Sequence, residues 1–235
     1  MPATFPYLRK ENCMEFNWRI LAETWGLYSD GLLTTLKYGI IAIIITVLWG
    51  IVIGAVNFRK PKGISLVTKA YVSFFRETPL LVQLYFLFFG LSRLMPISPG
   101  VIGVMALVLN DGAFIAEIVR GGLQSIEKGQ EEAAYTLGFS RLQTLIYFLL
   151  PQTVRKVQDS IMNMVSIIIK DTSLLMWITI TELTYVAQRV NSKYYEPVTA
   201  FLIAAVLYFA MFLLVQLIRI LMDRRSRTKN GLNVA

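Results

Sequence analysis

Long hydrophobic runs separated by short polar segments dominate the sequence. A membrane-spanning helix needs about twenty mostly apolar residues, because the hydrocarbon core of a bilayer is about 30 Å thick and each helical residue rises about 1.5 Å. Four runs meet this requirement, at residues 32–58, 67–91, 101–122 and 198–221. The pattern therefore predicts helices that cross a membrane.

A fifth run, at residues 154–190, is apolar in its first half and is interrupted by the polar residues 170–173. It resumes as the apolar segment 174–180. Charged breaks at membrane depth survive only inside protein or beside a water-filled cavity. We therefore expect one span followed by a short helix packed against its neighbours. The predicted fold class is an all-α integral membrane protein with about five transmembrane helices.

The basic residues near the ends of the spans predict how the chain is threaded, because lysine and arginine are retained on the cytoplasmic side. The basic turn at residues 59–62 and the basic tail at residues 223–235 are then both inside. Five spans with an internal C-terminus leave residues 1–30 as an extracytoplasmic N-terminal segment. The transmembrane domain occupies residues 31–222, with a cytoplasmic loop at about residues 124–144.

Composition supports the membrane assignment and excludes several chemistries. The 235 residues are 55% hydrophobic and 16% charged, with a net charge of +8. The basic residues form no stripe with interleaved aromatics, so we expect no nucleic-acid partner. With no histidine and one cysteine, Cys13, we expect no metal site, no His-based catalytic site and no intramolecular disulfide. Residues 1–30 lack the pattern of a removable signal peptide.

The polar interval at residues 124–144 reads QSIEKGQEEAAYTLGFSRLQT and has the pattern of a short helix. Glu131 and Glu132 lie near its predicted N-terminus, where carboxylates complement the helix dipole. Ala133, Ala134 and Leu137 give a small apolar face, and Gly138 supplies a C-terminal stop. Small side chains permit close backbone approach, so this helix is suited to lie in a groove on a partner.

The run Glu132-Ala133-Ala134, then Gly138, then Leu150-Pro151, resembles the EAA motif of ABC importer permeases. The family pattern prefers isoleucine where this chain has Phe148, a conservative departure. The segments 75–83, 116–122 and 170–174 are similar to segments of polar amino acid permeases, so the resemblance covers roughly residues 32–221.

The resemblance implies a type I ABC importer permease fold in a bacterial plasma (inner) membrane. It implies a second permease subunit, identical or related, two ATPase subunits, an extracytoplasmic solute-binding protein and a small polar amino acid as solute. This chain has no Gly-x-x-x-x-Gly-Lys-Ser/Thr loop, so ATP and Mg²⁺ are expected on the ATPase and no cofactor on this chain. The resemblance assigns ATPase coupling to Glu131, Glu132, Ala133, Ala134, Leu137, Gly138 and Arg141.

Polar side chains inside the spans are candidates for the solute pathway, because burying charge in a membrane is costly. Asp159, Asn163, Ser166 and Lys170 are spaced to lie on one face of the fourth span. Such a face offers the acceptor and the donor that a zwitterion needs. Alternatively, Asp159 pairs with Arg155, and Lys170 stabilises the broken backbone beside it.

The second and third spans add further candidates. Arg76, Leu80 and Gln83 are spaced to share one face of the second span, and Glu77 adjoins them just before the helix-disturbing Pro79. Arg76 and Glu77 could instead pair with each other or with the partner permease. Glu117 lies on a common face of the third span with Asn110 and Phe114; it lines the pathway or holds helices together.

Two other functions remain open at this point. An ion-coupled secondary transporter usually has two similar halves, and the chain has no internal repeat. A membrane scaffold that only recruits an ATPase would leave the polar faces inside the spans unexplained.

Overall fold

The computed structural model describes the backbone of residues 16–59 and 63–231, and side chains as far as Asp223. Within these ranges all regular secondary structure is helical. The elements are α1 (Trp18–Arg59), α2 (Ile64–Glu77), α3 (Leu80–Leu94), α4 (Pro99–Gln124), α5 (Lys128–Thr136), α6 (Arg141–Thr144), the π-helical turn η1 (Leu145–Leu149), α7 (Leu150–Lys156), α8 (Gln158–Asp171), the 3₁₀ helix η2 (Thr172–Ile178), α9 (Leu183–Tyr194) and α10 (Pro197–Gly231).

Four helical segments in the described part of the chain are long and apolar enough to cross a membrane. They are α1, α4, the segment Gln158–Ile178 of α8 and η2, and the segment Pro197–Asp223 of α10. The bent pair α2 and α3 makes a fifth if it is counted as one span. The prediction of an all-α protein with about five spans is therefore confirmed. The first helix begins at Trp18, before the start of the predicted span at residue 32.

The second predicted span is two helices that meet at an angle of 110°. Pro79 has no N–H to donate and its ring disfavours a helical conformation in the residue before it; Thr78 accordingly has an extended backbone. The prediction that Arg76, Leu80 and Gln83 share one helix face is wrong, because the break lies between the first residue and the other two.

The centre of the fold is the close packing of α1 on α4, which run side by side in the same direction. A Cβ atom added at Gly50 would lie 2.5 Å from Ile115 Cγ2, and one added at Gly54 would lie 2.6 Å from the carbonyl oxygen of Ala116. Glycines four residues apart allow two membrane helices to approach this closely. This contact fixes α1 against the helix that carries Asn110 and Glu117.

The fifth apolar run contains one span, as predicted, but the spanning segment Gln158–Ile178 continues through the predicted interruption, and the short helix that follows it is α9. α8 ends at Asp171, inside the predicted interruption, and η2 and α9 follow it. Glu182 caps α9: its carboxylate accepts hydrogen bonds from the backbone N–H groups of Thr184 and Tyr185 and from the hydroxyl of Tyr208 on α10. Glu182 is fully buried, so these bonds tie the break to the last helix.

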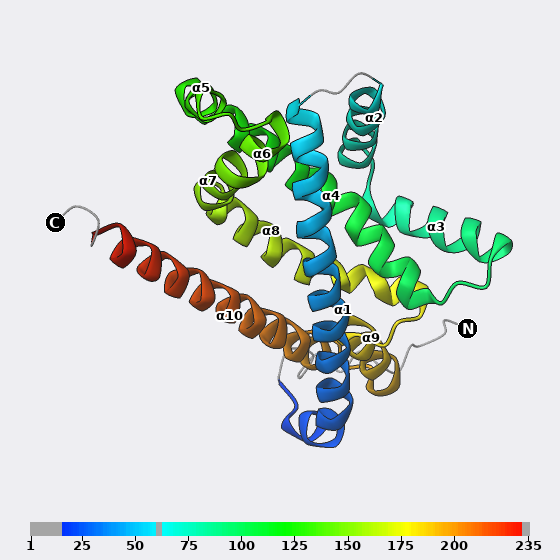
Figure 1. The fold of residues 1–235 in the computed structure, drawn as a ribbon. Coiled ribbons are helices and arrows are strands. Elements are labelled where there is room, and N and C mark those ends of the chain that lie inside the picture. The colour runs from blue at the N-terminus through cyan, green and yellow to red at the C-terminus, as the bar shows by residue number, and fades with distance from the viewer. Residues whose placement is uncertain (1–15, 60–62, 232–235) are drawn as a thin grey trace, which may run out of the picture.

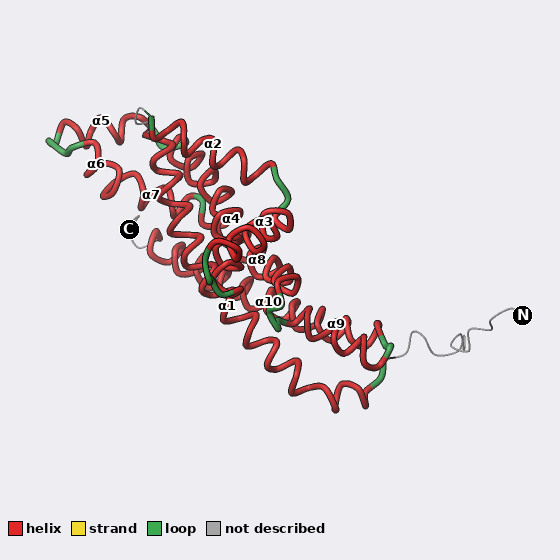
Figure 2. The backbone as a smooth tube through the Cα atoms, turned by 90° about the vertical axis from the view of Figure 1, so that its right-hand side faces the viewer, coloured by secondary structure: helices red, strands yellow, loops and turns green. Residues whose placement is uncertain are grey.

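The molecule is elongated, and its two ends differ. In both views the short helices α5 and α6 project from one end, whereas α9 and the first turns of α1 lie at the other end (Figures 1 and 2). α10 packs on α8 and α9 and extends away from α1 toward its C-terminus (Figure 1). The candidate coupling residues and the candidate pathway residues thus occupy different parts of one fold.

Candidate functional site

Residues 128–144, here called the α5–α6 hairpin, form the predicted coupling element outside the candidate spans. α5 ends where Gly138 takes a positive φ of 85°. The Gly138 N–H donates to the carbonyl oxygen of Tyr135 (2.9 Å), and the Phe139 N–H donates to that of Ala134 (3.1 Å). This is a Schellman motif, in which glycine is favoured because it has no Cβ. The predicted role of Gly138 as a helix stop is confirmed.

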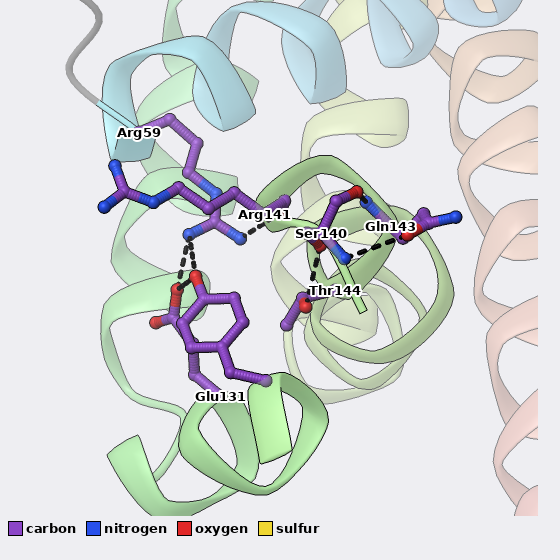
Figure 3. Close-up of polar contacts among 7 residues, drawn as sticks. Arg59, Glu131, Ser140, Arg141, Gln143 and Thr144 are labelled. Carbon is purple, nitrogen blue, oxygen red and sulfur yellow. Dashed lines mark hydrogen bonds and ion pairs between the residues drawn. The ribbon is translucent and has the colours of Figure 1, made fainter. Parts of the chain in front are cut away.

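α6 starts directly after the turn with a capping box. The hydroxyl of Ser140 accepts the N–H of Gln143 (3.3 Å), and the side chain of Gln143 accepts the N–H of Ser140 (2.9 Å) (Figure 3). The Thr144 hydroxyl donates to the Ser140 carbonyl oxygen (3.0 Å). These local bonds satisfy the free groups at the helix start, so the short connection between α5 and α6 has a defined conformation.

A single arginine joins the hairpin to the end of α1. The guanidinium of Arg59 donates to the carboxylate of Glu131, to the hydroxyl of Tyr135 (3.3 Å) and to the carbonyl oxygen of Arg141 (2.7 Å) (Figure 3). The Tyr135 hydroxyl also donates to Glu131 (2.6 Å). The hydrogen bond from Tyr135, together with the positive charge of Arg59, holds the pKa of Glu131 below its usual value.

The side of the hairpin that faces away from the protein combines polar and apolar groups. Leu137 is 73% exposed and Leu142 is 64% exposed, with Glu132 and Ala133 also at the surface. Ala134 is only 2% exposed. The predicted apolar face is therefore divided, because Ala134 points inward while Ala133 and Leu137 point outward. Both leucines lie outside the candidate spans, where a partner protein would cover them.

A polar cavity of about 310 Å³ lies between α1, α2 and α4. It brings together three predicted pathway residues, Arg76, Glu77 and Glu117. Its lining residues are Asn57, Lys69, Val72, Ser73, Arg76, Glu77, Glu117, Arg120 and Gln124. We call it the polar cavity.

Both signs of charge line the polar cavity. Arg120 Nε donates to Glu117 Oε2 (2.9 Å), and a second guanidinium N–H donates to Glu117 Oε1. The guanidinium of Arg76 lies over the ring of Phe114, 5.4 Å from its centroid. Among the described residues Arg76 forms no ion pair with Glu77. Two carboxylates and three cationic groups therefore line the cavity, since Glu77 and Lys69 also lie in its wall.

Gln83 does not line the polar cavity. Its amide donates to the carbonyl oxygens of Phe75 and Thr78 (both 3.0 Å) and to the Thr78 hydroxyl (2.6 Å). Asn110 donates to the same Phe75 carbonyl oxygen (2.9 Å) and to Gln83 Oε1 (3.1 Å). These amides satisfy the carbonyl groups that the break before α3 leaves free.

The candidate residues on α8 are divided between its surface and its packed side. Asp159 and Asn163 are exposed, whereas Ser166 is buried and donates to the Met162 carbonyl oxygen (3.3 Å). The carboxylate of Asp159 accepts a hydrogen bond from Arg219 Nε (2.9 Å). The proposed pairing with Arg155 is therefore wrong, because α10 packs along α8 and places Arg219 beside the carboxylate.

Comparison with known proteins agrees with this arrangement. Residues 46–228 match the family described as the binding-protein-dependent transport system inner membrane component. The chain belongs to this family. The resemblance to ABC importer permeases is thereby confirmed.

Relatives of this permease are named as permease proteins of glutamine and nopaline transport. It is 35% identical over 197 residues to the probable glutamine ABC transporter permease protein GlnP of Bacillus subtilis (strain 168), covering 81% of this chain and 88% of the relative. It is 32% identical over 201 residues to the nopaline transport system permease protein NocM of Agrobacterium fabrum (strain C58 / ATCC 33970), covering 81% and 83%.

Solved structures share the fold. A crystal structure of an amino acid ABC transporter with histidines superimposes with a TM-score of 0.80 at 32% identity, covering 90% of this permease and all of that chain. An inward-facing methionine ABC transporter superimposes with a TM-score of 0.75 at 18% identity, covering 88% and 97%, and supports the fold alone.

Sequence reasoning missed Arg59 as part of the coupling region of the permease. Arg59 and Glu131 are 72 residues apart, and Arg59 counted only as one of several basic residues that orient the chain. Its position as the last residue of α1 was the available signal, because that helix end lies at the same side of the membrane as the coupling loop.

Proposed function

We propose that this chain is the membrane-spanning permease subunit of an ABC importer that moves a polar amino acid into the cytoplasm. An extracytoplasmic binding protein delivers the solute, and two ATPase subunits, which bind ATP and Mg²⁺, supply the energy. The observation that carries this proposal is the α5–α6 hairpin, with its exposed Leu137 and Leu142 on a chain that belongs to the permease family.

The hairpin is suited to docking on the ATPase for two physical reasons. Its turn is fixed by the Schellman motif at Gly138 and the capping box at Ser140, so little order has to be gained on binding. Its outward side offers two leucines beside the carboxylate of Glu132, which suits a groove with an apolar floor and a basic rim.

This function fixes the orientation of the chain. The hairpin and the C-terminal tail face the cytoplasm, and the end that carries α9 faces outward. The density of lysine and arginine beyond residue 218 and around residue 59 supports this orientation, because basic residues are retained inside.

The solute passes between this permease and a second permease subunit, identical or related. The exposed polar face of α8, with Asp159, Asn163 and Lys170, lies within a predicted span. Such groups are stable in a membrane only beside protein or water. A partner permease that covers this face and encloses water along it satisfies that requirement.

Amino acid chemistry suits the polar cavity as a station on the pathway. An α-carboxylate is matched by Arg76, which is exposed and has no ion pair among the described residues. An α-ammonium is matched by Glu117, which Arg120 holds in place. The names of the relatives support an amino acid as the solute.

The test is uptake of radiolabelled amino acids into vesicles that contain the purified complex, with binding protein supplied in excess. ATP-dependent uptake that ceases with a hydrolysis-deficient ATPase is expected. Uptake driven by a proton or sodium gradient without ATP would show an ion-coupled secondary transporter. Assembly with the ATPase without any uptake would show a membrane scaffold.

Asn163→Leu tests the pathway assigned to α8. Asn163 is exposed on the span, and leucine removes its hydrogen-bond donor and acceptor. The polar groups of the solute then lose their partner, which costs about 1–3 kcal/mol of binding free energy. This corresponds to a loss of affinity of roughly five- to a hundredfold. Ser166→Ala is the matched control, because Ser166 is buried against its own helix. Unchanged uptake per assembled Asn163→Leu complex, at all solute concentrations, removes Asn163 from the pathway.

A further inference from the structure

We propose that Arg59 is a positioning residue that makes α1 and the α5–α6 hairpin move as one body when the ATPase acts on the hairpin. The inference rests on the proposed docking function of the hairpin. It concerns how movement of that element reaches the membrane, and Arg59 itself touches neither solute nor nucleotide.

Among the described residues of α1, Arg59 is the one that hydrogen-bonds to the hairpin. α5 packs mainly on α6 and η1, so most of its contacts lie within its own segment of the chain. The guanidinium of Arg59 contacts both arms of the hairpin, Glu131 and Tyr135 on α5 and the carbonyl oxygen of Arg141 at the start of α6. Within the described residues, this one side chain links both arms of the hairpin to the end of α1.

The geometry requires arginine. Its planar guanidinium presents several N–H donors in a fixed fork, so one group can bind a carboxylate and a carbonyl oxygen at once. Lysine carries the same charge on one ammonium group, which lacks this fixed, planar arrangement of donors. The side chains of Arg59 and Glu131 are 21% and 28% exposed, so these charge-assisted bonds are partly shielded from water.

A displacement of Arg59 reaches the polar cavity through rigid contacts. α1 is in direct contact with α4 at Gly50 and Gly54, where backbone meets side chain and backbone without space for a methyl group. Asn57, one half-turn before Arg59, lines the cavity from α1, and Glu117 lines it from α4. The chain itself joins the hairpin to α4 through residues 125–127, and Arg59 adds the link to α1. A hairpin bound to Arg59 therefore moves both walls of the cavity together, and a hairpin released from it acts on α4 alone.

Distance measurements test the mechanical claim without assuming transport. Cysteines are introduced by Gln130→Cys on α5 and Val52→Cys on α1, both exposed, after Cys13→Ser removes the native thiol. Spin labels on the assembled complex should give one narrow distance distribution that stays narrow when ATP is added. Arg59→Gln should broaden it. Glu131→Gln removes the charge of the other partner and should also broaden the distance distribution. This variant provides the test if the Arg59→Gln complex does not assemble.

Coupling is measured on the same complexes as solute molecules imported per ATP hydrolysed. Losing a charge-assisted bond between partly buried groups changes an equilibrium by roughly tenfold. We expect Arg59→Gln to lower uptake per ATP by about that factor while the ATPase still co-purifies. Arg59→Lys keeps the positive charge but lacks the planar guanidinium. Its uptake per ATP should therefore lie between that of Arg59→Gln and that of the unsubstituted complex. Arg155→Gln, which removes an exposed positive charge from α7, should leave it unchanged.

The inference is overturned if the distance distribution keeps its width in Arg59→Gln and Glu131→Gln, or if uptake per ATP is unchanged in both. An equal loss in Arg155→Gln also overturns it, because the effect would then come from net charge. Absence of ATP-driven uptake in the unsubstituted complex is a failure of the proposed function instead, and the width of the distribution still decides the role of Arg59.

Discussion

Single residues in this permease act through backbone geometry more than through charge. Gly138 sets the turn of the hairpin with a positive φ, and Gln83 satisfies the carbonyl groups at the break before α3. Both residues were chosen from the sequence as functional candidates. The structure places the first at the turn of the α5–α6 hairpin and the second in the packing around the break.

Gly138→Ala should weaken the coupling element by a purely conformational effect. A Cβ at this position meets nothing within 4 Å, but an L-residue in the left-handed region costs about 1–2 kcal/mol. We expect solute-stimulated ATP hydrolysis to fall while the permease remains inserted, and Gly138→Asp to reduce it further. Gly129→Ala is the matched control, since this open site in α5 has no positive φ. Equal hydrolysis in both alanine variants contradicts the prediction.

Gln83→Leu should reduce stability and spare transport per folded complex. The substitution leaves the partly buried Thr78 carbonyl oxygen without its amide donor, at a cost of about 1–3 kcal/mol. Thermal unfolding of the purified complex measures the loss. Gln188→Leu, at an exposed position of α9, controls for the added leucine. A Gln83→Leu complex with normal stability but impaired uptake would return Gln83 to the solute pathway.

The elements are held together by close helix contacts and by bonds across breaks. α1 and α4 meet through Gly50 and Gly54, and η2 and α9 are joined to α10 through Glu182. The carboxylate of Glu182 is fully buried, and its oxygen atoms accept hydrogen bonds from Thr184, Tyr185 and Tyr208, so α9 is fixed against α10.

Gly54→Ala should separate α1 from α4. The added methyl group would lie 2.6 Å from a backbone oxygen and 2.9 Å from Val119 Cβ. Neither atom belongs to the flexible end of a side chain, so the helices themselves must shift to relieve the overlap. Overpacking of this kind costs about 1–3 kcal/mol, and the thermal midpoint should fall by several degrees. Gly26→Ala in the same helix has open space and should leave the midpoint unchanged. If the two variants unfold at the same temperature, α1 and α4 are not locked at this crossing.

At the scale of the whole molecule, the two ends are built from different elements. The hairpin end holds the proposed ATPase surface, and the opposite end holds α9 (Figure 2). The polar cavity lies nearer the hairpin end, because it is lined by the last turns of α1 and α4. The orientation in the membrane decides which end the solute meets first.

Thiol labelling tests that orientation. In a Cys13→Ser chain, Tyr195→Cys places a thiol on a residue that is 86% exposed beside α9, and Gln130→Cys places one on α5. A membrane-impermeant maleimide in intact cells should label the first and reach the second only after lysis. The reverse pattern would invert the topology. The native Cys13, which lies outside the described residues, is expected to be accessible in intact cells as well.

The sequence alone determined the parts of this protein that depend on local pattern. Run length gave the spans, Lys and Arg placement gave the predicted orientation, Pro79 marked a weak point in the second span, and Gly138 marked the end of α5. These features follow from hydrophobicity and backbone sterics within a few residues. The motif around Glu132 then indicated the family.

Only the tertiary structure decided which distant residues meet. The 110° bend turned one predicted helix face into two, and helix packing paired Asp159 with Arg219 and not with Arg155. The same packing divided the apolar face of α5 between Ala134 and Leu137 and brought Arg59 to Glu131. Such contacts depend on how helices cross in space, and no short-range pattern in the chain specifies that crossing.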